Sequence, residues 1–350
     1  MKRALLAVYL LAFAQAARAD YQAGMVAYYV DDYAAAFAQF RASAAMGDLQ
    51  SEFMLGNMYR LGRGVRQSYS SAWKWYRLAA KSGCAQAQND LGAMYQHGRG
   101  PARDYARALK WYRAAAEQGD GEAQENVGSL YWQGLGVAKD NGYAVKLFQL
   151  AAHQGIAGAQ FNMGIAYAIG RGTPQDYAEA ARWYREAARQ GDAAAQSNLG
   201  ALYASGRGVP QNYVEAVKWY LRAAHQGEAT AQANLGSIYA NGRGVRQNYS
   251  EAMKWYQLAA QQGFVPAQIE IGSMYANGQG ASRSLVNAYM WCDVSQASTE
   301  TDSKYFNMTR ECLALLAAHM ASVQIEEGKR LASAWLAAHP RVGDQVNEAR

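Results

Sequence analysis

Three sets of residues recur along the chain at a spacing that could support chemistry. Asparagine amides could bind the backbone of a peptide, because an amide both donates and accepts hydrogen bonds. A row of basic residues could bind a polyanion, and Gly-Arg-Gly triplets such as Gly206-Arg207-Gly208 could cradle a phosphate group. The first two sets are Asn126, Asn162, Asn198 and Asn234, and Lys74, Lys110, Lys146, Arg182, Lys218 and Lys254.

Residues for catalysis or metal binding are scattered. The chain has no nucleophile elbow, no Walker loop and no Cys-x-x-Cys pair. Its five histidines form no His-Glu-x-x-His pair: they are His97, His153, His225, His319 and His339. We therefore expect no enzymatic activity, no cofactor and no metal site.

The elements that position these residues follow from a repeat of 36 residues. An aliphatic residue followed by Gly recurs seven times, and each Gly is followed three residues later by Tyr. Seven units between Leu49 and Glu300 cover 252 of the 350 residues without an insertion or deletion. We number them repeats 1 to 7, at 49–84, 85–120, 121–156, 157–192, 193–228, 229–264 and 265–300.

Each repeat is predicted to contain two helices. In the first, for example Ala87 to Tyr95, apolar residues lie four apart on one face. The second, for example Tyr69 to Ala80, has a stripe of Ala, Trp and Tyr that predicts a buried face. It should end at a left-handed Gly such as Gly83. Its predicted N-caps are Ser68, Asp104, Asp140, Asp176, Asn212, Asn248 and Ser284, with capping-box spacing at Glu179, Glu215 and Glu251.

Because neither helix can bury its stripe alone, the repeats are predicted to stack into a solenoid. The pattern A-x-A-Q-x-x-L-G-x-x-Y-x-x-G-x-G, then D-Y-x-x-A-x-x-W-Y-x-x-A-A-x-x-G, resembles Sel1-like repeat proteins. This resemblance implies an all-α, right-handed α/α superhelical solenoid with helical caps at 20–48 and 301–350. Sel1-like repeats are similar to tetratricopeptide repeats, which implies a scaffold that binds proteins. In this arrangement the Gly-x-Gly triplets are turns between repeats rather than phosphate loops.

The resemblance also separates two candidate binding surfaces. By comparison with peptide-binding repeats, the asparagines should face a concave groove, where they could hold an extended peptide or instead tie neighbouring repeats together. The sequence leaves both interpretations open. Further groove candidates are Asp90, Glu270, Phe161, Trp132, Gln96 and Glu125.

The basic row should lie on the outer face of the second helices. A row of Lys and Arg there is commonly a solvated surface. If it binds a ligand, an acidic polysaccharide of the cell wall is the alternative partner, and it would bind in a strongly salt-dependent way.

The first 19 residues have the features of a secretory signal peptide. Met1-Lys2-Arg3 is basic, Ala4 to Ala14 is apolar, and an Ala-x-Ala site precedes Asp20. Cleavage removes three basic residues and no acid, so the net charge falls from +6 to 31 − 28 = +3. We expect a periplasmic or secreted protein with no membrane span, no nucleic-acid partner and an unidentified protein or peptide partner.

An exported chain would meet an oxidising compartment, where cysteines form disulfides. Cys292 takes the place of the second-helix Tyr, a position expected to pack against the aliphatic-Gly pair 15 to 16 residues later. A loop longer by four residues would bring Cys312 there, so a Cys292–Cys312 bridge is predicted and Cys84 would stay free.

Overall fold

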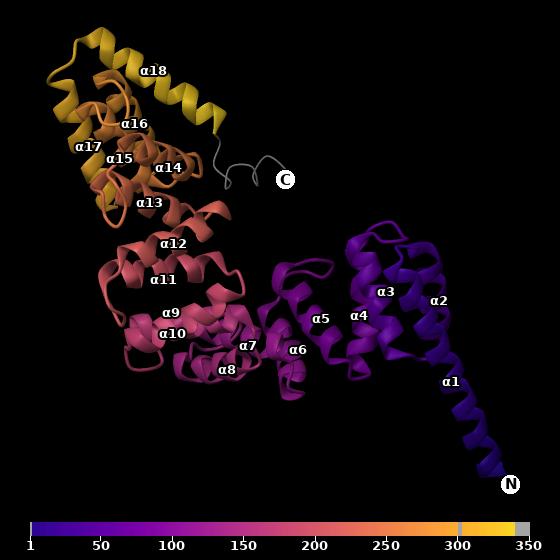
Figure 1. Cartoon of the computed structure of the whole chain (residues 1–350). Helices are drawn as coiled ribbons and strands as arrows, with labels where there is room; N and C mark the ends of the chain where they lie inside the picture. The colour runs from indigo at the N-terminus through magenta and orange to yellow at the C-terminus, as the bar shows by residue number, and fades with distance from the viewer. Residues whose placement is uncertain (1, 300–302, 340–350) are drawn as a thin grey trace. The chain divides into compact units, whose positions relative to one another are not determined.

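The computed structural model describes residues 2–299 and 303–339, and every regular element in this part of the chain is an α-helix (Figure 1). The chain divides into two compact units, residues 1–175 and 176–350. The first contains α1 Lys2–Tyr29, α2 Tyr33–Ala45, α3 Leu49–Leu61, α4 Tyr69–Lys81, α5 Ala85–His97, α6 Tyr105–Glu117, α7 Gly121–Gln133, α8 Asn141–His153 and α9 Ala157–Ile169. The second contains α10 Tyr177–Arg189, α11 Ala193–Ser205, α12 Tyr213–His225, α13 Ala229–Asn241, α14 Tyr249–Gln261, α15 Val265–Asn277, α16 Leu285–Ala297, α17 Lys304–Ala317 and α18 Ser322–Ala338.

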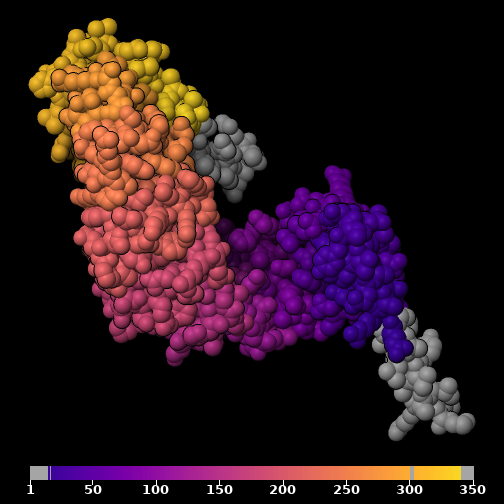
Figure 2. Space-filling model, viewed as in Figure 1, coloured from indigo at the N-terminus to yellow at the C-terminus, as the bar shows by residue number. Residues whose placement is uncertain are grey.

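Within each unit, consecutive helices pack together as a stacked series of helix pairs. The colour in Figure 2 accordingly changes in bands along the residues of each unit. This is the predicted all-α solenoid of 36-residue repeats. Neighbours in the stack are also neighbours in sequence, because each pair buries its apolar face against the next pair.

The predicted start signals of the second helices are confirmed at all seven positions, where the N-cap side chain accepts a backbone N–H from the first turn. The capping boxes are only half formed. Glu179, Glu215 and Glu251 make ion pairs with the basic residue three positions later instead of turning back to the cap. The predicted closing glycines also adopt positive φ, for example 99° at Gly83.

The glycine of the aliphatic-Gly pair packs on the second-helix tyrosine of its own repeat. A Cβ atom added at Gly56 would lie 2.5 Å from the Tyr76 ring, and one at Gly236 would lie 2.6 Å from the Tyr256 ring. The sequence spacing predicted that this tyrosine packs against the aliphatic-Gly pair of the following repeat, so that prediction was wrong for the glycine contact. Only a residue without a side chain leaves room for the ring to bury itself there.

The Gly-x-Gly triplets join the two helices within a repeat, so the prediction that they join one repeat to the next was wrong. Their second glycine nevertheless makes an inter-repeat contact. A Cβ atom at Gly244 would lie 2.6 Å from Tyr213 Cβ, in the preceding repeat, and Gly244 has a φ of 70°. Chain geometry and the neighbouring backbone both require glycine at this position.

The tryptophans of the second helices are less buried than the sequence suggests. Trp183 and Trp291 are buried, but the other four are half-buried: Trp75, Trp111, Trp219 and Trp255. The tyrosine that follows each of them carries the core instead, as at Tyr76 and Tyr112. The tyrosine packs directly on the glycine of the first helix in the same repeat.

The N-terminal cap is a helix pair formed by α1 and α2. α1 packs on α2, and a Cβ atom at Gly24 would lie 2.7 Å from the Phe40 ring, so this pair reproduces the Gly–Tyr contact of the repeats. The predicted cleavage site between Ala19 and Asp20 lies inside α1.

Among the described residues, no helix combines the length and the apolarity needed to cross a bilayer.

At the C-terminal cap, Cys292 occupies the site of the second-helix tyrosine and bonds to Cys312 on α17, with Cα atoms 6.4 Å apart. Gly272 therefore faces a sulfur atom at 3.4 Å instead of a ring. α18 packs on α16, where Trp335 meets Trp291 edge to face. The end of the predicted repeat 7 at Glu300 and the tail at 340–350 lie outside the described residues.

Candidate functional site

Hollows between the first helices of consecutive repeats share one set of sequence positions, and we call each such hollow a niche. Its floor is the aromatic residue of the second helix, which is a tyrosine with its hydroxyl in repeats 1, 2 and 5 and Phe148 in repeat 3. One wall carries the residue directly after the recurring first-helix tyrosine, and the other wall, in the next repeat, carries the asparagine position. We compare the repeat 1–2, 2–3, 3–4 and 5–6 niches.

Arg60 occupies the repeat 1–2 niche. Its Nε donates to Tyr76 Oη at 3.0 Å and its Nη2 to Asn57 Oδ1 at 3.3 Å, while Tyr76 itself donates to Asn57 Oδ1 at 2.8 Å. Asp90 takes the asparagine position. Burial raises the pKa of Asp90 to about 6, although the nearby Arg60 guanidinium lowers it. The remaining hollow, lined in part by Arg60, Asp90 and Arg99, has a volume of about 150 Å³.

Gln96 takes the equivalent place in the repeat 2–3 niche and accepts a hydrogen bond from Tyr112 Oη at 2.8 Å. On the opposite wall, Asn126 Nδ2 donates to Asn89 Oδ1 of the preceding repeat at 3.0 Å. This asparagine therefore ties two repeats together.

The repeat 3–4 niche is closed by an aromatic side chain. Trp132 packs on Phe148 and carries the Arg171 guanidinium 4.2 Å above its ring. Asn162 Nδ2 donates to Glu125 Oε1 at 3.2 Å, again across the repeat boundary. The asparagines of these two niches act as inter-repeat struts, which is one of the two interpretations that the sequence left open.

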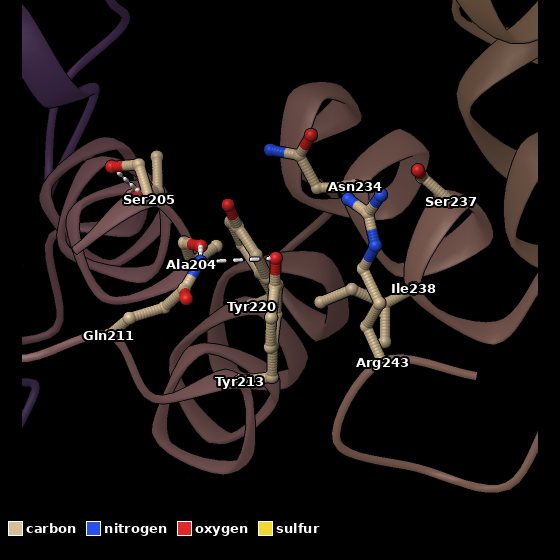
Figure 3. A pocket seen from close by; sticks show the side chains of 10 residues that line it. Ala204, Ser205, Gln211, Tyr213, Tyr220, Asn234, Ser237, Ile238 and Arg243 are labelled. Atoms are coloured by element: carbon tan, nitrogen blue, oxygen red, sulfur yellow. Dashed lines mark hydrogen bonds between the residues drawn. The ribbon is translucent and has the colours of Figure 1, made fainter. Parts of the chain in front are cut away.

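The repeat 5–6 niche is open, with a volume of about 420 Å³. Ala204 stands where Arg60 and Gln96 stand in the first two niches, so no side chain covers the tyrosine hydroxyl. In Figure 3 the hydroxyl of Tyr220, the amide of Asn234 and the guanidinium of Arg243 lie around one open space. The niche is lined by Ala201, Ala204, Ser205, Gln211, Tyr213, Tyr220, Asn234, Ser237, Ile238 and Arg243.

The polar groups of this niche lack the partners that their equivalents have. Within the part of the chain that the structure describes, Tyr220 Oη and the Asn234 amide make no hydrogen bond. Arg243 lies 5.8 Å from the centre of the Tyr213 ring and has no ion pair with a described residue. Gln211 is held in place, since its Nε2 donates to Ala204 O at 2.8 Å and to Tyr213 Oη at 3.2 Å.

The other predicted groove residues are dispersed. Asn198 on α11 and Phe161 on α9 are half-buried, and Glu270 on α15 is exposed. Glu125 and Gln96 make the hydrogen bonds given above, and so contribute to packing between or within repeats. Of the asparagine row, Asn234 is the member whose half-buried amide lines an open pocket.

The basic row is exposed on the second helices, as predicted from their pattern. Its three members in the second unit each form an ion pair with a glutamate of the same helix: Arg182 with Glu179, Lys218 with Glu215 and Lys254 with Glu251. These pairs reduce the positive charge that this part of the row presents to a polyanion.

Tyr220, Arg243 and Ala204 were not among the residues predicted for the groove. A partial signal was present, because the residue after the first-helix tyrosine is Arg60, Gln96 and Trp132 in the first three repeats and Ala in the last four, Ala204 among them. Nothing in the spacing says that this variable residue covers a tyrosine from the other helix. That relation appears only when the two helices are packed.

Comparison with known proteins supports the repeat assignment. A model of the Sel1 repeat matches residues 49–84, 85–120, 121–156, 157–192, 193–228, 229–264 and 265–293. The chain belongs to the Sel1 repeat family. Proteins of this family are solenoids typical of protein-interaction scaffolds. A search of curated proteins gives no match.

Two solved structures of Sel1 repeat proteins are similar to this chain. One is a Sel1 repeat protein from Oxalobacter formigenes, with 38% identity and a TM-score of 0.63, covering 68% of this chain and 98% of that protein. The other is a protective antigen present in uropathogenic Escherichia coli strains, with 26% identity and a TM-score of 0.54, covering 92% of both chains. The likeness supports the solenoid fold over most of the chain.

Proposed function

We propose that this Sel1 repeat protein is an exported, non-enzymatic scaffold that binds another protein through the face of its first helices. The observation that carries the proposal is the open repeat 5–6 niche. It presents a hydroxyl, an amide and a guanidinium that have no hydrogen-bond or ion-pair partner among the described residues. Polar groups on a binding face gain most when a bound chain replaces the water around them with matched partners.

The rival function is binding of an acidic polysaccharide by the row from Lys74 to Lys254. In the first unit Lys74, Lys110 and Lys146 are exposed and form no ion pair with a described residue. In the second unit each basic member is paired with a glutamate. A stripe that is partly neutralised by its own helices is a weaker polyanion site than its sequence suggests.

Variants of the two surfaces distinguish these functions. The protein that begins at Asp20 is used to capture partners from an envelope extract. The dissociation constant of each captured partner is then measured for the unchanged protein and for each variant. We expect Asn234→Ala combined with Arg243→Gln to weaken binding at least tenfold, and the triple change of Lys74, Lys110 and Lys146 to Glu to leave it unchanged.

The opposite pattern, with binding that also weakens steeply as salt is added, would replace the scaffold proposal with the polysaccharide one. Circular dichroism of each variant before capture shows whether the fold is intact. Loss of binding in a folded variant can then be assigned to the surface that was changed.

Export is supported by the Cys292–Cys312 disulfide, because such bonds persist in oxidising compartments. Cys84 is the free cysteine of the described residues and is buried. Mass spectrometry of protein recovered from its native host should find a chain that begins at Asp20 and carries one free thiol. A chain that begins at Met1 in the exported fraction would contradict this.

A further inference from the structure

The hydrogen bonds of the filled niches indicate what the open niche would bind. In the repeat 1–2 and 2–3 niches the tyrosine hydroxyl donates to a side-chain oxygen, Asn57 Oδ1 or Gln96 Oε1. The asparagine amides likewise donate to oxygens, as Asn162 Nδ2 does to Glu125 Oε1. In each case, the acceptor is an amide or carboxylate oxygen supplied by the chain itself.

The repeat 5–6 niche has the same two donors, and no described residue accepts a hydrogen bond from either of them. Ala204 replaces the side chains that reach the tyrosine hydroxyl in the first two niches, and Ser197 stands 37 residues before Asn234, where Glu125 stands before Asn162. Tyr220 Oη and Asn234 Nδ2 are therefore available to an oxygen from outside the chain.

Charge decides which kind of oxygen fits best. Arg243 is the one charged residue among the ten that line the niche, and it has no ion pair with a described residue. In the repeat 1–2 niche the equivalent wall carries Asp90, a carboxyl group of the chain itself that already interacts with the Arg60 guanidinium. A guanidinium and two neutral donors together match a carboxylate, because charge-assisted hydrogen bonds are stronger than neutral ones.

We propose that the repeat 5–6 niche is a carboxylate-binding subsite that takes an Asp or Glu side chain, or the C-terminal carboxylate, of the protein bound along the first helices. Tyr220 Oη, Asn234 Nδ2 and Arg243 donate to the two oxygens. The proposal rests on the proposed scaffold function and assigns the chemistry of its partner at one point of contact.

Three short peptides test the subsite directly. They are acetyl-Ala-Ala-Glu-Ala-Ala-amide, the same peptide with Gln in place of Glu, and acetyl-pentaalanine with a free C-terminal carboxylate. The readout is the side-chain amide signal of Asn234 in protein labelled with 15N-asparagine, identified by its loss in Asn234→Ala.

We expect the Glu peptide to shift this signal saturably and the Gln peptide to bind about tenfold more weakly, because it loses the charged interaction with Arg243. Comparing the Glu peptide with pentaalanine shows whether a side-chain or a terminal carboxylate is preferred. Tighter binding of either one supports the subsite.

Matched variants sharpen the test. Ala204→Gln reproduces Gln96 of the repeat 2–3 niche and should abolish the shift by giving Tyr220 an internal acceptor. Arg243→Gln should weaken binding of the Glu peptide to that of the Gln peptide. Arg99→Gln, the same change in the repeat 1–2 niche, is the control and should have no effect.

Equal binding of the Glu peptide, the Gln peptide and pentaalanine, or unchanged binding in Ala204→Gln and Arg243→Gln, would overturn the subsite. So would the absence of a saturable shift up to about 10 mM peptide. These failures are distinct from failure of the scaffold proposal. A captured partner that still depends on the first-helix face but ignores both variants would leave the scaffold standing without this subsite.

Discussion

The repeat 1–2 and 5–6 niches are built on the same repeat pattern, yet one is filled and the other is open. Arg60 lies over the tyrosine hydroxyl in the first niche, whereas Ala204 leaves the hydroxyl of Tyr220 uncovered in the second. The volumes, about 150 and 420 Å³, reflect this exchange. In these two niches, the side chain after the first-helix tyrosine therefore decides whether the tyrosine hydroxyl of the second helix is covered.

The largest expected difference comes from Arg60→Ala. It removes two donors from the niche and leaves the half-buried Asp90 without its nearest cation, so the free energy of unfolding should fall by about 2–3 kcal/mol. Arg243→Gln, in the open niche, should change it by less than about 0.5 kcal/mol. Urea denaturation of both variants measures this, and equal losses would remove the distinction between the niches.

A pH effect should be confined to the filled niche. Because burial raises the pKa of Asp90 to about 6 from an ordinary value of 3.8, the folded chain binds more protons than the unfolded chain between these values. The contribution of Asp90 to stability therefore falls as the pH rises from 4 to 6. Asp90→Asn cannot titrate, so the variant should not lose this stability as the pH rises.

Denaturation of Asp90→Asn and of the unchanged protein at pH 4 and pH 7 provides the measurement. The free energy of unfolding of the variant minus that of the unchanged protein should be about 2 kcal/mol larger at pH 7 than at pH 4. Other titrating groups cancel in this comparison. A pH-independent difference would mean that Asp90 titrates normally.

The tyrosine hydroxyls offer a smaller contrast. Tyr76→Phe deletes a group that donates to Asn57 and accepts from Arg60, and should cost about 1–2 kcal/mol of unfolding free energy. Tyr220→Phe deletes a hydroxyl that has no partner among the described residues, and should be neutral within about 0.5 kcal/mol. Thermal unfolding distinguishes them. A large loss in Tyr220→Phe would reveal an internal role for that hydroxyl.

The smallest expected difference concerns the asparagines. Asn162→Ala removes a strut to Glu125 and should lower the unfolding free energy by about 1 kcal/mol, whereas Asn234→Ala should leave it nearly unchanged. Binding of the Glu peptide should be weakened more by Asn234→Ala than by Asn162→Ala. If both variants lose the same stability, the asparagines form one structural row and Asn234 is not a ligand group.

The repeat pattern predicted most of the fold because its signals are local. An N-cap such as Ser68 needs only its own first turn, and a closing glycine such as Gly83 needs only a left-handed backbone. Within the C-terminal cap expected at 301–350, the described residues form α17 Lys304–Ala317 and α18 Ser322–Ala338.

The candidate site depended instead on contacts between positions far apart in sequence. The asparagine row looks uniform in sequence, but Asn126 and Asn162 donate to acceptors 37 residues earlier, while no described residue accepts from Asn234. The basic row also looks uniform, yet glutamates three residues before Arg182, Lys218 and Lys254 pair with it in the second unit.

The sequence by itself determined the repeat, the helices and their ends, because backbone hydrogen bonds and the period of apolar residues are read over a few neighbours. Only the tertiary structure decided which niche is open. A hydroxyl is free or satisfied according to whether a side chain from another helix reaches it, as Arg60 reaches Tyr76 and as Ala204 cannot reach Tyr220. That depends on the distance between packed side chains, which no spacing along the chain specifies.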